Sequence, residues 1–454
     1  MAEIDALAVY YEAYETGRLH IGADGAITFA YDPRWLDTAG AFPISVTMPL
    51  TSDRYGPETV HPWVANLLPE ERQLMTLAKI MGVDRNDTIA ILREIGGDTA
   101  GALSFGEPSL REKWDYTPLQ DFYGLNTPED ALLRHFEDLK ERPFLAGEDG
   151  IRLSLAGGQE KTALTVLDSD GNPRLGLPED GDRLALPRDG APSTVIIKPD
   201  NPRLPGIVEN EAYCLSLATA IGIRAAEVTI LKAGHRNALA VARYDRNRRD
   251  HSGIRRLHQE DFAQANRVFP TNKYEMGTVP GPSLKTLLET GNYLPSRDAL
   301  HLLDQVIFNI VVANTDAHAK NYSLLLTDPH SLAPLYDVSC VLPWRDRKIN
   351  QNFAQKLARK KRRPGDIEGR HWDLIAESAG YNPRETRKRV EEIVDRIVAE
   401  GPHVATRTAE LTGAVPELVT QAQDCVEENA LRIIRQLKDN SNAAERPKPE
   451  TAAN

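Results

Sequence analysis

The chain has 454 residues, of which 41% are hydrophobic and 26% charged, and its formal net charge is −12. This composition is typical of a folded protein of two or three domains and excludes a disordered chain. A net negative charge argues against binding of nucleic acid or of an acidic membrane over the whole protein surface. A local basic patch is still compatible with this net charge. The 3 cysteines show no C-x-x-C spacing, and no signal peptide or membrane-length apolar run is present, so we expect a soluble protein of the reducing cytosol.

The first hundred residues predict a small α+β domain, which we place at residues 1–106. Strand-like stretches LAVYY, AITFAY and ISVTM are separated by turn signals such as Ala23-Asp24-Gly25, and a polar helical segment follows at 69–93. Residues 107–148 are rich in proline and charge and are expected to form a connector with a helical pattern around 130–139.

Residues 149–245 predict a second, β-rich unit. Its strands are LTVL, STVIIK, VTIL and ALAVARYD, and the turn-like AGHRN between the last two predicts a hairpin. The stretch ENEAYCLSLATAIG has helical spacing, and Gly222 is placed to end that helix.

Residues 246–438 are expected to be mostly helical. The stretch DALHLLDQVIFNIVVAN predicts a helix that ends just before Asp316, and VEEIVDRIV and PELVTQAQDCVEENALRIIRQL predict two more. The apolar face of the first helix is expected to contain Leu300, Leu303, Val306, Ile307, Ile310 and Val311. The polar, proline-containing end at 439–454 predicts a disordered tail.

The stretch LSLAGGQEKT at 153–162 resembles a phosphate-binding loop but fits neither familiar kind. A P-loop requires glycine directly before the lysine, where this chain has Glu160, and the dinucleotide fingerprint G-x-G-x-x-G is also absent. Gly157 and Gly158 nevertheless permit close backbone approach to a phosphate, and Lys161 supplies a charge. Taken alone, a Gly-Gly followed by charged residues is more often an ordinary turn.

Residues farther along the chain fit the parts that phosphoryl transfer by kinases requires, in the order in which kinases carry them. They are an ATP lysine on a strand (Lys198), a helix glutamate that orients it (Glu211), a catalytic aspartate (Asp316) and two magnesium ligands (Asn321 and Asp337). Asp316 and Asn321 have the D-x-x-x-x-N spacing, and amide and carboxylate oxygens suit Mg²⁺. Simpler interpretations exist for Lys198 as an edge-strand lysine, for Glu211 as a solvated helix residue and for Asp337 as a turn residue. The ordered set therefore carries the prediction.

The sequence departs from common protein kinases at several points. Asn-Thr precedes Asp316 in place of His-Arg, glycine is missing after Asp337-Val338, and no A-P-E segment is found. His318 is similar to the histidine of the D-R-H-x-x-N loop in phosphoinositide kinases, but it could equally be an ordinary loop histidine.

The chain resembles the HipA family, the serine/threonine-protein kinase toxins of bacterial HipBA toxin-antitoxin modules. The resemblance is carried by SLAGGQEKTAL, STVIIKPD, VENEAYCLSLATAIGI, ALAVARYDR, RLHQEDFAQ, NTDAHAKNYSLLL and LAPLYDVSCVLPW, and in the first domain by FAYDPRWL, NLLPEE and EIGGDTAGALSF. It implies an α+β, two-lobed, protein-kinase-like fold, similar also to phosphoinositide kinases, with an extra N-terminal subdomain. The resemblance is weaker in the C-terminal helices.

The resemblance also implies a site that binds ATP and Mg²⁺, with Asp316 as the catalytic residue and Asn321 and Asp337 as metal ligands. The backbone at 242–244 would form the hinge that meets adenine, and a family glutamate is replaced there by Ala242. The ATP-binding residues are expected to be Ala156, Gly157, Gly158, Gln159, Glu160, Lys161, Lys198, Ala242, Arg243, Tyr244, His318, Lys320, Asn321, Tyr336 and Asp337.

Further expectations from the resemblance concern regulation and partners. Ser154 corresponds to the family's autophosphorylation site, and a phosphate there would repel nucleotide phosphates and inactivate the enzyme. The family implies a helix-turn-helix antitoxin of the HipB kind, with operator DNA bound through the complex and an aminoacyl-tRNA synthetase, such as glutamyl-tRNA synthetase, as substrate. Growth arrest, persistence and a cytoplasmic location, at the nucleoid when in the complex, would follow.

Two other functions and one basic run stay open on the sequence. The chain could be a catalytically dormant co-repressor scaffold, or a kinase of a small molecule or lipid, and labelled ATP in a lysate would separate these from a protein kinase. The run RKKRR stands out in an acidic chain and could face DNA phosphates or be a solvated loop. It consists of Arg359, Lys360, Lys361, Arg362 and Arg363.

Overall fold

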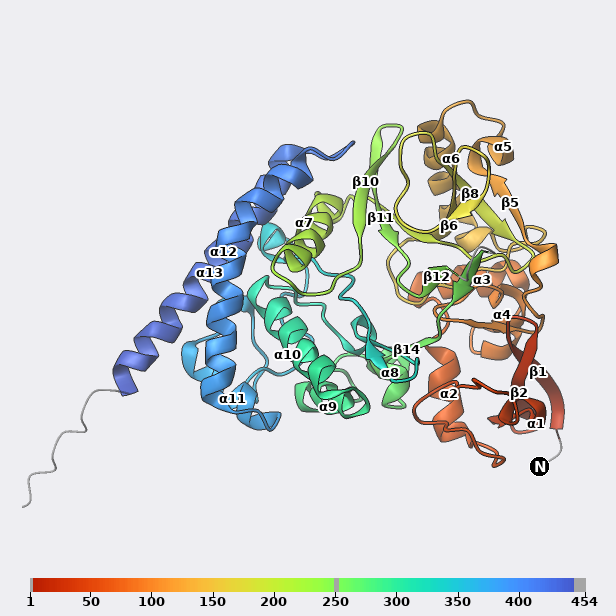
Figure 1. Cartoon of the computed structure of the whole chain (residues 1–454), viewed down its shortest axis with the longest axis horizontal. Coiled ribbons are helices and arrows are strands. Elements are labelled where there is room, and N and C mark those ends of the chain that lie inside the picture. Colours follow the sequence, from red (N-terminus) through yellow and green to blue (C-terminus); the bar gives the residue numbers. More distant parts are fainter. Residues whose placement is uncertain (1–2, 249–252, 445–454) are drawn as a thin grey trace, which may run out of the picture.

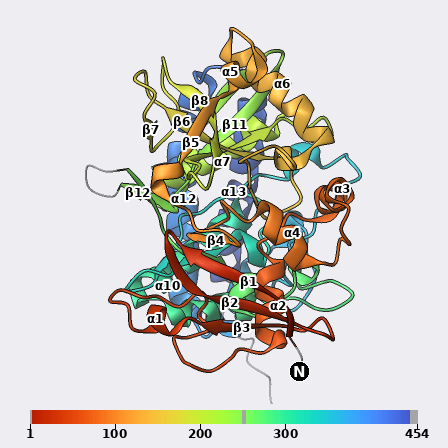
Figure 2. The same ribbon diagram turned by 90° about the vertical axis from the view of Figure 1, so that its right-hand side faces the viewer.

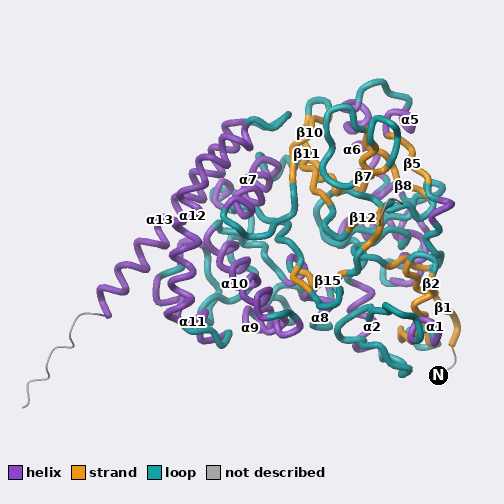
Figure 3. The backbone as a smooth tube through the Cα atoms, viewed as in Figure 1, coloured by secondary structure: helices purple, strands orange, loops and turns teal. Residues whose placement is uncertain are grey.

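The structure is a computed structural model that describes residues 3–248 and 253–444. Long helices gather on one side of the molecule and the strands on the other, with the N-terminal part at the lower right (Figure 1). The tube view shows the same division between the helical side and the strand side (Figure 3). The fold is therefore mixed α and β in two lobes, with an additional N-terminal unit.

The N-terminal unit is a four-stranded antiparallel sheet with four helices, seen from its strand face in Figure 2. The strand order is β3-β2-β1-β4. Its elements are β1 (Glu3–Tyr11), β2 (Tyr14–Gly22), β3 (Ile27–Tyr31), α1 (Pro33–Leu36), α2 (Pro57–Ala65), α3 (Glu71–Met81), α4 (Thr88–Ile95) and β4 (Leu103–Phe105).

Three local expectations for this unit were incomplete or wrong. Sequence patterning missed β2, whose polar residues hid the strand. The stretch ISVTM is not a strand: Met48 N–H donates to Ser45 O and closes a tight turn, which puts Ile44 and Met48 in the core although the chain reverses. The helical segment predicted at 69–93 is two helices, separated where Gly82 ends α3 with a left-handed φ of 67°.

The central sheet forms most of the second lobe and has seven strands, ordered β10-β11-β9-β6-β8-β5, with β7 paired to β6. The hairpin predicted around AGHRN is confirmed as β10 and β11. The elements are β5 (Asp115–Pro118), α5 (Leu119–Tyr123), α6 (Pro128–Glu141), β6 (Thr162–Leu167), β7 (Pro173–Arg174), β8 (Arg183–Arg188), β9 (Val195–Pro199), α7 (Ile207–Ala220), β10 (Val228–Ala233) and β11 (Arg236–Ala242). Residues 107–148, which we expected to be a connector, supply the edge strand β5 and the helix α6, which packs on β10.

The helix α7 has the stop that its sequence predicted. Gly222 has a φ of +89° and donates its N–H to Thr219 O, while Ile223 N–H reaches Ala218 O. This pattern of backbone bonds ends the helix in the way that glycine commonly does. The helix packs against β10 and β11 on one side and against the C-terminal helices on the other, so it links the two lobes.

The helical lobe follows β11. Its elements are β12 (Arg246–Arg248), β13 (Ile254–Arg256), β14 (Gln259–Asp261), α8 (Phe262–Ala265), α9 (Leu284–Glu289), α10 (Ser296–Val311), β15 (Ser323–Leu325), β16 (Ser331–Leu332), α11 (Gly369–Ser378), α12 (Pro383–Ala409) and α13 (Pro416–Ala444). The three predicted long helices are confirmed as α10, α12 and α13. On α10 the predicted apolar face is buried except for Leu300, which is 48% exposed because it lies on the first turns, before the helix enters the core.

The C-terminus differs in part from the tail that we expected at 439–454. Residues 439–444 continue α13, and residues 445–454 lie outside the described part of the chain. No helix among the described residues is long and apolar enough to cross a membrane.

Two large hydrophobic cores organise the molecule. One is formed by the helical lobe together with α7. The other is shared between the N-terminal unit and the central sheet, where Leu7, Phe29 and Trp63 belong to the same cluster as Leu164 and Ile197. The N-terminal unit is thus packed into the second lobe through a common core, which fixes its position relative to the nearby cleft.

Candidate active site

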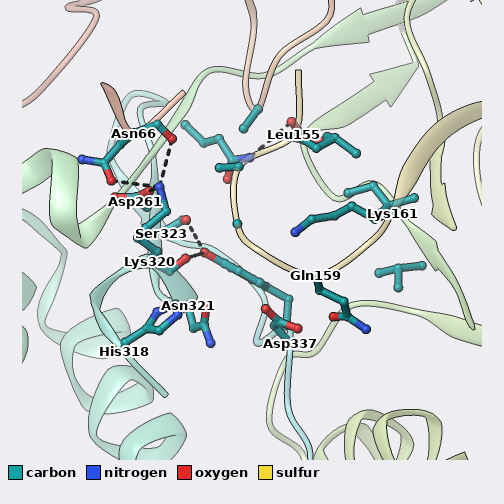
Figure 4. A pocket seen from close by; sticks show the side chains of 18 of the residues that line it. Asn66, Leu155, Gln159, Lys161, Asp261, His318, Lys320, Asn321, Ser323 and Asp337 are labelled. Atoms are coloured by element: carbon teal, nitrogen blue, oxygen red, sulfur yellow. Dashed lines mark hydrogen bonds and ion pairs between the residues drawn. The ribbon is translucent and has the colours of Figure 1, made fainter. Parts of the chain in front are cut away.

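A cavity of about 360 Å³ lies between the central sheet and the helical lobe. It gathers residues that are far apart in the sequence: the glycine loop at 153–161, the end of β9, the segment 242–245, the loop at 316–321, and Asp337. Figure 4 shows Lys161 and Gln159 on one side of this space and Lys320, Asn321 and Asp337 on the other. The cavity therefore joins the two halves of the predicted kinase set.

Lys198 lines the cavity and is held there by two carboxylates. It lies near the end of β9, and its Nζ atom is 2.6 Å from Glu211 Oε1 on α7 and 2.8 Å from Asp337 Oδ1. Burial alone would lower the pKa of Lys198, but the charges of Asp337 and Glu211 outweigh it and raise the pKa. Lys198 is thus a fixed cation, oriented by a helix glutamate as kinase lysines are.

Asp337 and Glu211 differ in their environments although they share Lys198. Burial would raise the pKa of Asp337, but Lys198 and Lys161 outweigh it and hold that pKa well below its usual range. For Glu211 burial prevails and raises the pKa, in spite of the Lys198 charge. Asp337 has a left-handed φ of 59°, an unusual backbone for a non-glycine residue, which places its carboxylate at the edge of the cavity.

Asp316 lies on the turn after α10, as the sequence predicted, and lines the cavity at its open side. The Tyr274 hydroxyl donates a hydrogen bond of 2.6 Å to Asp316 Oδ1. Partial removal of water by neighbouring groups raises the pKa of Asp316 above its usual range, while the Tyr274 hydrogen bond opposes the shift. The side chain nevertheless stays exposed to solvent, so Asp316 is an accessible carboxylate that Tyr274 holds in place beside the cavity.

The loop between Asp316 and Asn321 is closed on itself. Asn321 Nδ2 donates to Asp316 O at 2.8 Å, which leaves the amide oxygen of Asn321 available. His318, which lies between Asp316 and Asn321 in the loop, is buried, and burial lowers its pKa well below the usual value. Its Nδ1 atom has no hydrogen-bond partner among the described residues. His318 also lines the cavity, so it is one of the polar residues that a ligand there would meet.

The donor set also fits a magnesium ion carried with phosphates. Among the described residues no group of three or more His, Cys, Asp or Glu could hold a metal. Mg²⁺ is commonly bound by one or two protein oxygens while phosphates and water complete its shell, so one aspartate and one asparagine are a suitable number. Asn321 and Asp337 both line the cavity and would supply these oxygens.

The glycine loop runs along the opposite wall. Ala156, Gly157, Gly158, Gln159 and Lys161 all line the cavity, and Gly157 has a φ of +104°, which only glycine adopts readily. Burial lowers the pKa of Lys161 to about 8, and no ion pair of this lysine is found among the described residues. Glu160 instead faces a second cavity of about 690 Å³ beyond the loop, which Glu211 also lines.

The segment expected to form the hinge lies beside two stacked tyrosines. Tyr244 and Tyr336 line the cavity with ring centroids 5.7 Å apart and an interplanar angle of 29°. Ala242 N–H donates to Glu227 O and Arg243 N–H to Thr194 O, so these two amides are already bonded within the protein. The Arg243 side chain points elsewhere, into a buried cluster with Asp98 and Asp245.

Ser154 and the basic run do not line either cavity. Ser154 is fully buried, and its hydroxyl donates to Leu67 O at 2.7 Å. The run at 359–363 lies on a turn in which four of the five residues are exposed and Arg362 is tied to Leu357 O. Ser154 thus lies directly behind the cavity wall, because Leu67 and the next residue, Leu155, both line the cavity, whereas no residue of the basic run lines it.

Sequence reasoning missed several residues that line the cavity. Gln259, Glu260, Asp261 and Gln264 come from RLHQEDFAQ, a stretch that carried the resemblance but was given no role. Asn66 begins NLLPEE, another stretch that carried the resemblance without a role, whereas Lys273 and Tyr274 gave no sequence signal because their neighbours in the site lie far away along the chain. The contact between Asn66 and the predicted residue Lys320 illustrates this separation along the chain. The Lys320 ammonium donates to Asn66 O and Oδ1, at 3.0 and 2.8 Å.

Two families match the chain over most of its length. The HipA N-terminal domain matches residues 7–106, and the HipA-like C-terminal domain matches residues 153–401. The chain belongs to the HipA family. The resemblance of its motifs is thereby confirmed for both the N-terminal unit and the two lobes around the cavity.

Relatives of this HipA-family chain are named as kinases. A candidate kinase of Sinorhizobium fredii, Y4mE, is 35% identical over 90% of this chain and 94% of its own length. The serine/threonine-protein kinase toxin HipA of Shewanella oneidensis is 29% identical over 73% of each chain. A solved structure from Shewanella oneidensis MR-1, of a toxin-antitoxin complex of HipA, HipB and operator DNA, aligns with a TM-score of 0.79 at 24% identity and covers 96% of this chain and 99% of that chain. The expected kinase-like fold is confirmed by this likeness.

Proposed function

We propose that this HipA-family chain is an ATP- and Mg²⁺-dependent serine/threonine-protein kinase and the toxin of a HipBA-type module. The observation that supports it most is the meeting of Lys198, Asp316, Asn321 and Asp337 around one cavity, with Glu211 behind the lysine. Charge stabilisation and positioning are what phosphoryl transfer requires of a protein, and these side chains supply both.

The proposed reaction assigns one task to each group. Asp316 accepts a hydrogen bond from the acceptor serine and takes its proton as the hydroxyl oxygen bonds to the γ-phosphorus and the bond to ADP breaks. Lys198 and Lys161 face the phosphates with positive charge, and the stacked Tyr244 and Tyr336 offer an aromatic surface at the base. Mg²⁺, when bound by Asn321 and Asp337, neutralises phosphate charge.

Self-inactivation is proposed at Ser154. Its hydroxyl is buried against Leu67 O, so a phosphoryl group could be added only when the glycine loop has left this position. A phosphate of about −1.5 to −2 charge could not return to a buried site that accepts no anion, and it would also repel ATP. Phosphorylation would then keep the loop out of the cavity.

The proposed partners follow from the family. The substrate would be a translation component, by family an aminoacyl-tRNA synthetase such as glutamyl-tRNA synthetase, and its modification would arrest growth and promote persistence. A HipB-like helix-turn-helix antitoxin would bind this chain and make it a co-repressor on operator DNA. The exposed run at 359–363 is proposed to contact DNA phosphates in that complex.

The salt dependence of operator binding tests whether the basic run contacts DNA. Neutralising Arg359, Lys360 and Lys361 in the antitoxin complex should reduce the salt dependence of operator binding, by about 0.9 in the log–log slope for each DNA phosphate that the run no longer neutralises. An unchanged slope would remove the run from the DNA interface.

Labelled ATP tests the proposed activity directly. The chain is incubated with γ-labelled ATP, Mg²⁺ and a bacterial lysate, beside Asp316→Asn, which has the same size but no carboxylate. We expect label on a protein band at serine or threonine, and none with the variant. Label on no protein would favour a dormant co-repressor, and label on a metabolite would favour a small-molecule kinase.

A further inference from the structure

One segment of the N-terminal unit reaches the cavity and contacts both of its walls. We call residues 66–73, which join α2 to α3, the cleft segment. Leu67 and Leu68 are 4% and 3% exposed and belong to the core that the N-terminal unit shares with the central sheet. The cleft segment is therefore anchored firmly before it meets the site.

Its first set of contacts is with the glycine loop. Leu67 O accepts from the Ser154 hydroxyl at 2.7 Å, and Glu70 N–H donates to Gly157 O at 3.3 Å. Gln73 Nε2 donates to Gln159 O at 3.2 Å. The three bonds are distributed along the loop, so they fix its course rather than one point on it.

A second set of contacts is with the opposite wall. Lys320, next to Asn321, donates to both oxygens of Asn66, as Figure 4 shows. The Glu70 carboxylate lies 2.6 Å from Lys273 Nζ, and Asn66 Nδ2 donates to Val268 O at 2.7 Å. A single short segment thus bridges the glycine loop and the helical lobe.

The hydrogen bonds between the glycine loop and the cleft segment determine which way the loop's backbone N–H groups point. Gly157 and Gln159 use their carbonyl oxygens toward the cleft segment. In a planar trans peptide the next N–H points the opposite way, so the N–H of Gly158 is turned away from the segment, and Gly158 lines the cavity. Backbone N–H groups presented in this way form anion-binding sites.

We propose that the cleft segment positions the glycine loop over the cavity, and that Gln73 and Glu70 are the positioning side chains that set its distance from the helical lobe. The proposal rests on the proposed function, because it gives the loop the task of meeting ATP phosphates. The N-terminal unit, which contributes none of the predicted kinase residues, would thereby have a role in the nucleotide site.

Two isosteric variants test the proposal. Gln73→Glu keeps the size of the side chain but replaces the donor to Gln159 O with a carboxylate, and Glu70→Gln removes the charge opposite Lys273. The control is Lys79→Gln, an exposed residue on the same helix α3. Hydrogen exchange of residues 154–159 is measured without nucleotide, together with the ATP dissociation constant, the ATP turnover rate and the melting temperature of the whole chain.

We expect faster exchange in residues 154–159 and ATP binding weakened about three- to tenfold, the size of one lost hydrogen bond. Turnover at saturating ATP should change much less in both variants, and so should the melting temperature of Gln73→Glu, whereas a merely structural defect would lower both quantities. Glu70→Gln is expected to lower the melting temperature as well, because it takes a carboxylate from Lys273 and the buried Lys320. Exchange in the loop equal to that of the wild type and of Lys79→Gln would overturn the proposal. If the wild type binds no ATP, the proposed function fails, while the exchange result still decides whether the segment holds the loop.

Discussion

The ammonium group of Lys198 lies 2.8 Å from Asp337 Oδ1, across the boundary between the two lobes. Lys198 belongs to the central sheet, and Asp337 follows β16 in the helical lobe. This ion pair therefore links Lys198, the phosphate-facing charge of one lobe, to Asp337, the candidate metal ligand of the other lobe. Glu211 completes the arrangement from α7, which packs against both lobes.

The first prediction concerns Lys198. Lys198→Met keeps the length of the side chain and removes its charge, so phosphoryl transfer should fall by about 10²-fold or more, as it does when other transition-state contacts are removed. Lys232→Met, at an exposed position on β10 of the same sheet, is the matched control. Single-turnover transfer is the measurement, and a Lys198→Met rate within about threefold of the wild type would remove this residue from the mechanism.

Asp98 should carry a large share of the stability of the interface with the N-terminal unit. Its carboxylate is 2% exposed and lies 2.8 Å from both Arg246 and Arg256 and 3.4 Å from Arg243. Asp98→Asn would leave Arg256 without its anion and would leave Arg243 and Arg246 with Asp245 alone, and breaking such a buried pair costs about 3–5 kcal/mol of the free energy of unfolding. Urea denaturation beside the exposed control Asp180→Asn measures this cost, and equal stabilities of the two variants would contradict the assignment.

The same cluster predicts sensitivity to acid. Burial alone would raise the pKa values of Asp98 and Asp245, but the neighbouring arginines lower them, to about 2 for Asp245. A lowered pKa in the folded state gives stability that is complete above the unfolded value of about 3.9 and is lost as the pH falls toward the folded value. Denaturation midpoints should therefore fall between about pH 4 and pH 2. A smaller fall in Asp98→Asn is expected, and parallel curves would exclude this source of the sensitivity.

Phosphorylation of Ser154 should make the kinase activity fall with time in the presence of ATP. If Ser154 is the self-inactivating site, preincubation with ATP and Mg²⁺ should silence the wild type while Ser154→Ala keeps its activity. Loss of the bond to Leu67 O should cost only about 1 kcal/mol of the free energy of unfolding. Mass spectrometry locates the phosphate, and a Ser154→Ala protein that loses activity at the same rate would contradict the switch.

The sequence predicted those parts of the site that depend on local structure. Lys198 could be placed because STVIIK is an apolar strand, and Glu211 because its neighbours have helical spacing, and both elements are confirmed. The helix before Asp316 was likewise predictable from its apolar face, apart from Leu300. Here local periodicity and tertiary structure agree.

The parts that escaped prediction depend on contacts between distant residues. The backbone at 242–244 stays predicted as the hinge, but no local pattern shows that the side chain of Arg243 is bound by Asp98 of the N-terminal unit. No local pattern shows that Asn66 meets Lys320, because the contact joins two units across the cleft. Likewise ISVTM alternates like a strand, but the Tyr31 hydroxyl binds Ile44 N–H and Met48 O and holds it as a turn.

In the proposed reaction Asp316 assists the transfer while Asp337 holds the metal. Binding of ATP with Mg²⁺ and transfer of labelled phosphate, measured on Asp316→Asn and Asp337→Asn side by side, test it most directly. We predict that both variants lose transfer, that Asp316→Asn still binds ATP with Mg²⁺ dependence, and that Asp337→Asn loses this dependence. Transfer by Asp316→Asn at the wild-type rate would exclude the role of Asp316, and undiminished Mg²⁺ dependence in Asp337→Asn would exclude that of Asp337.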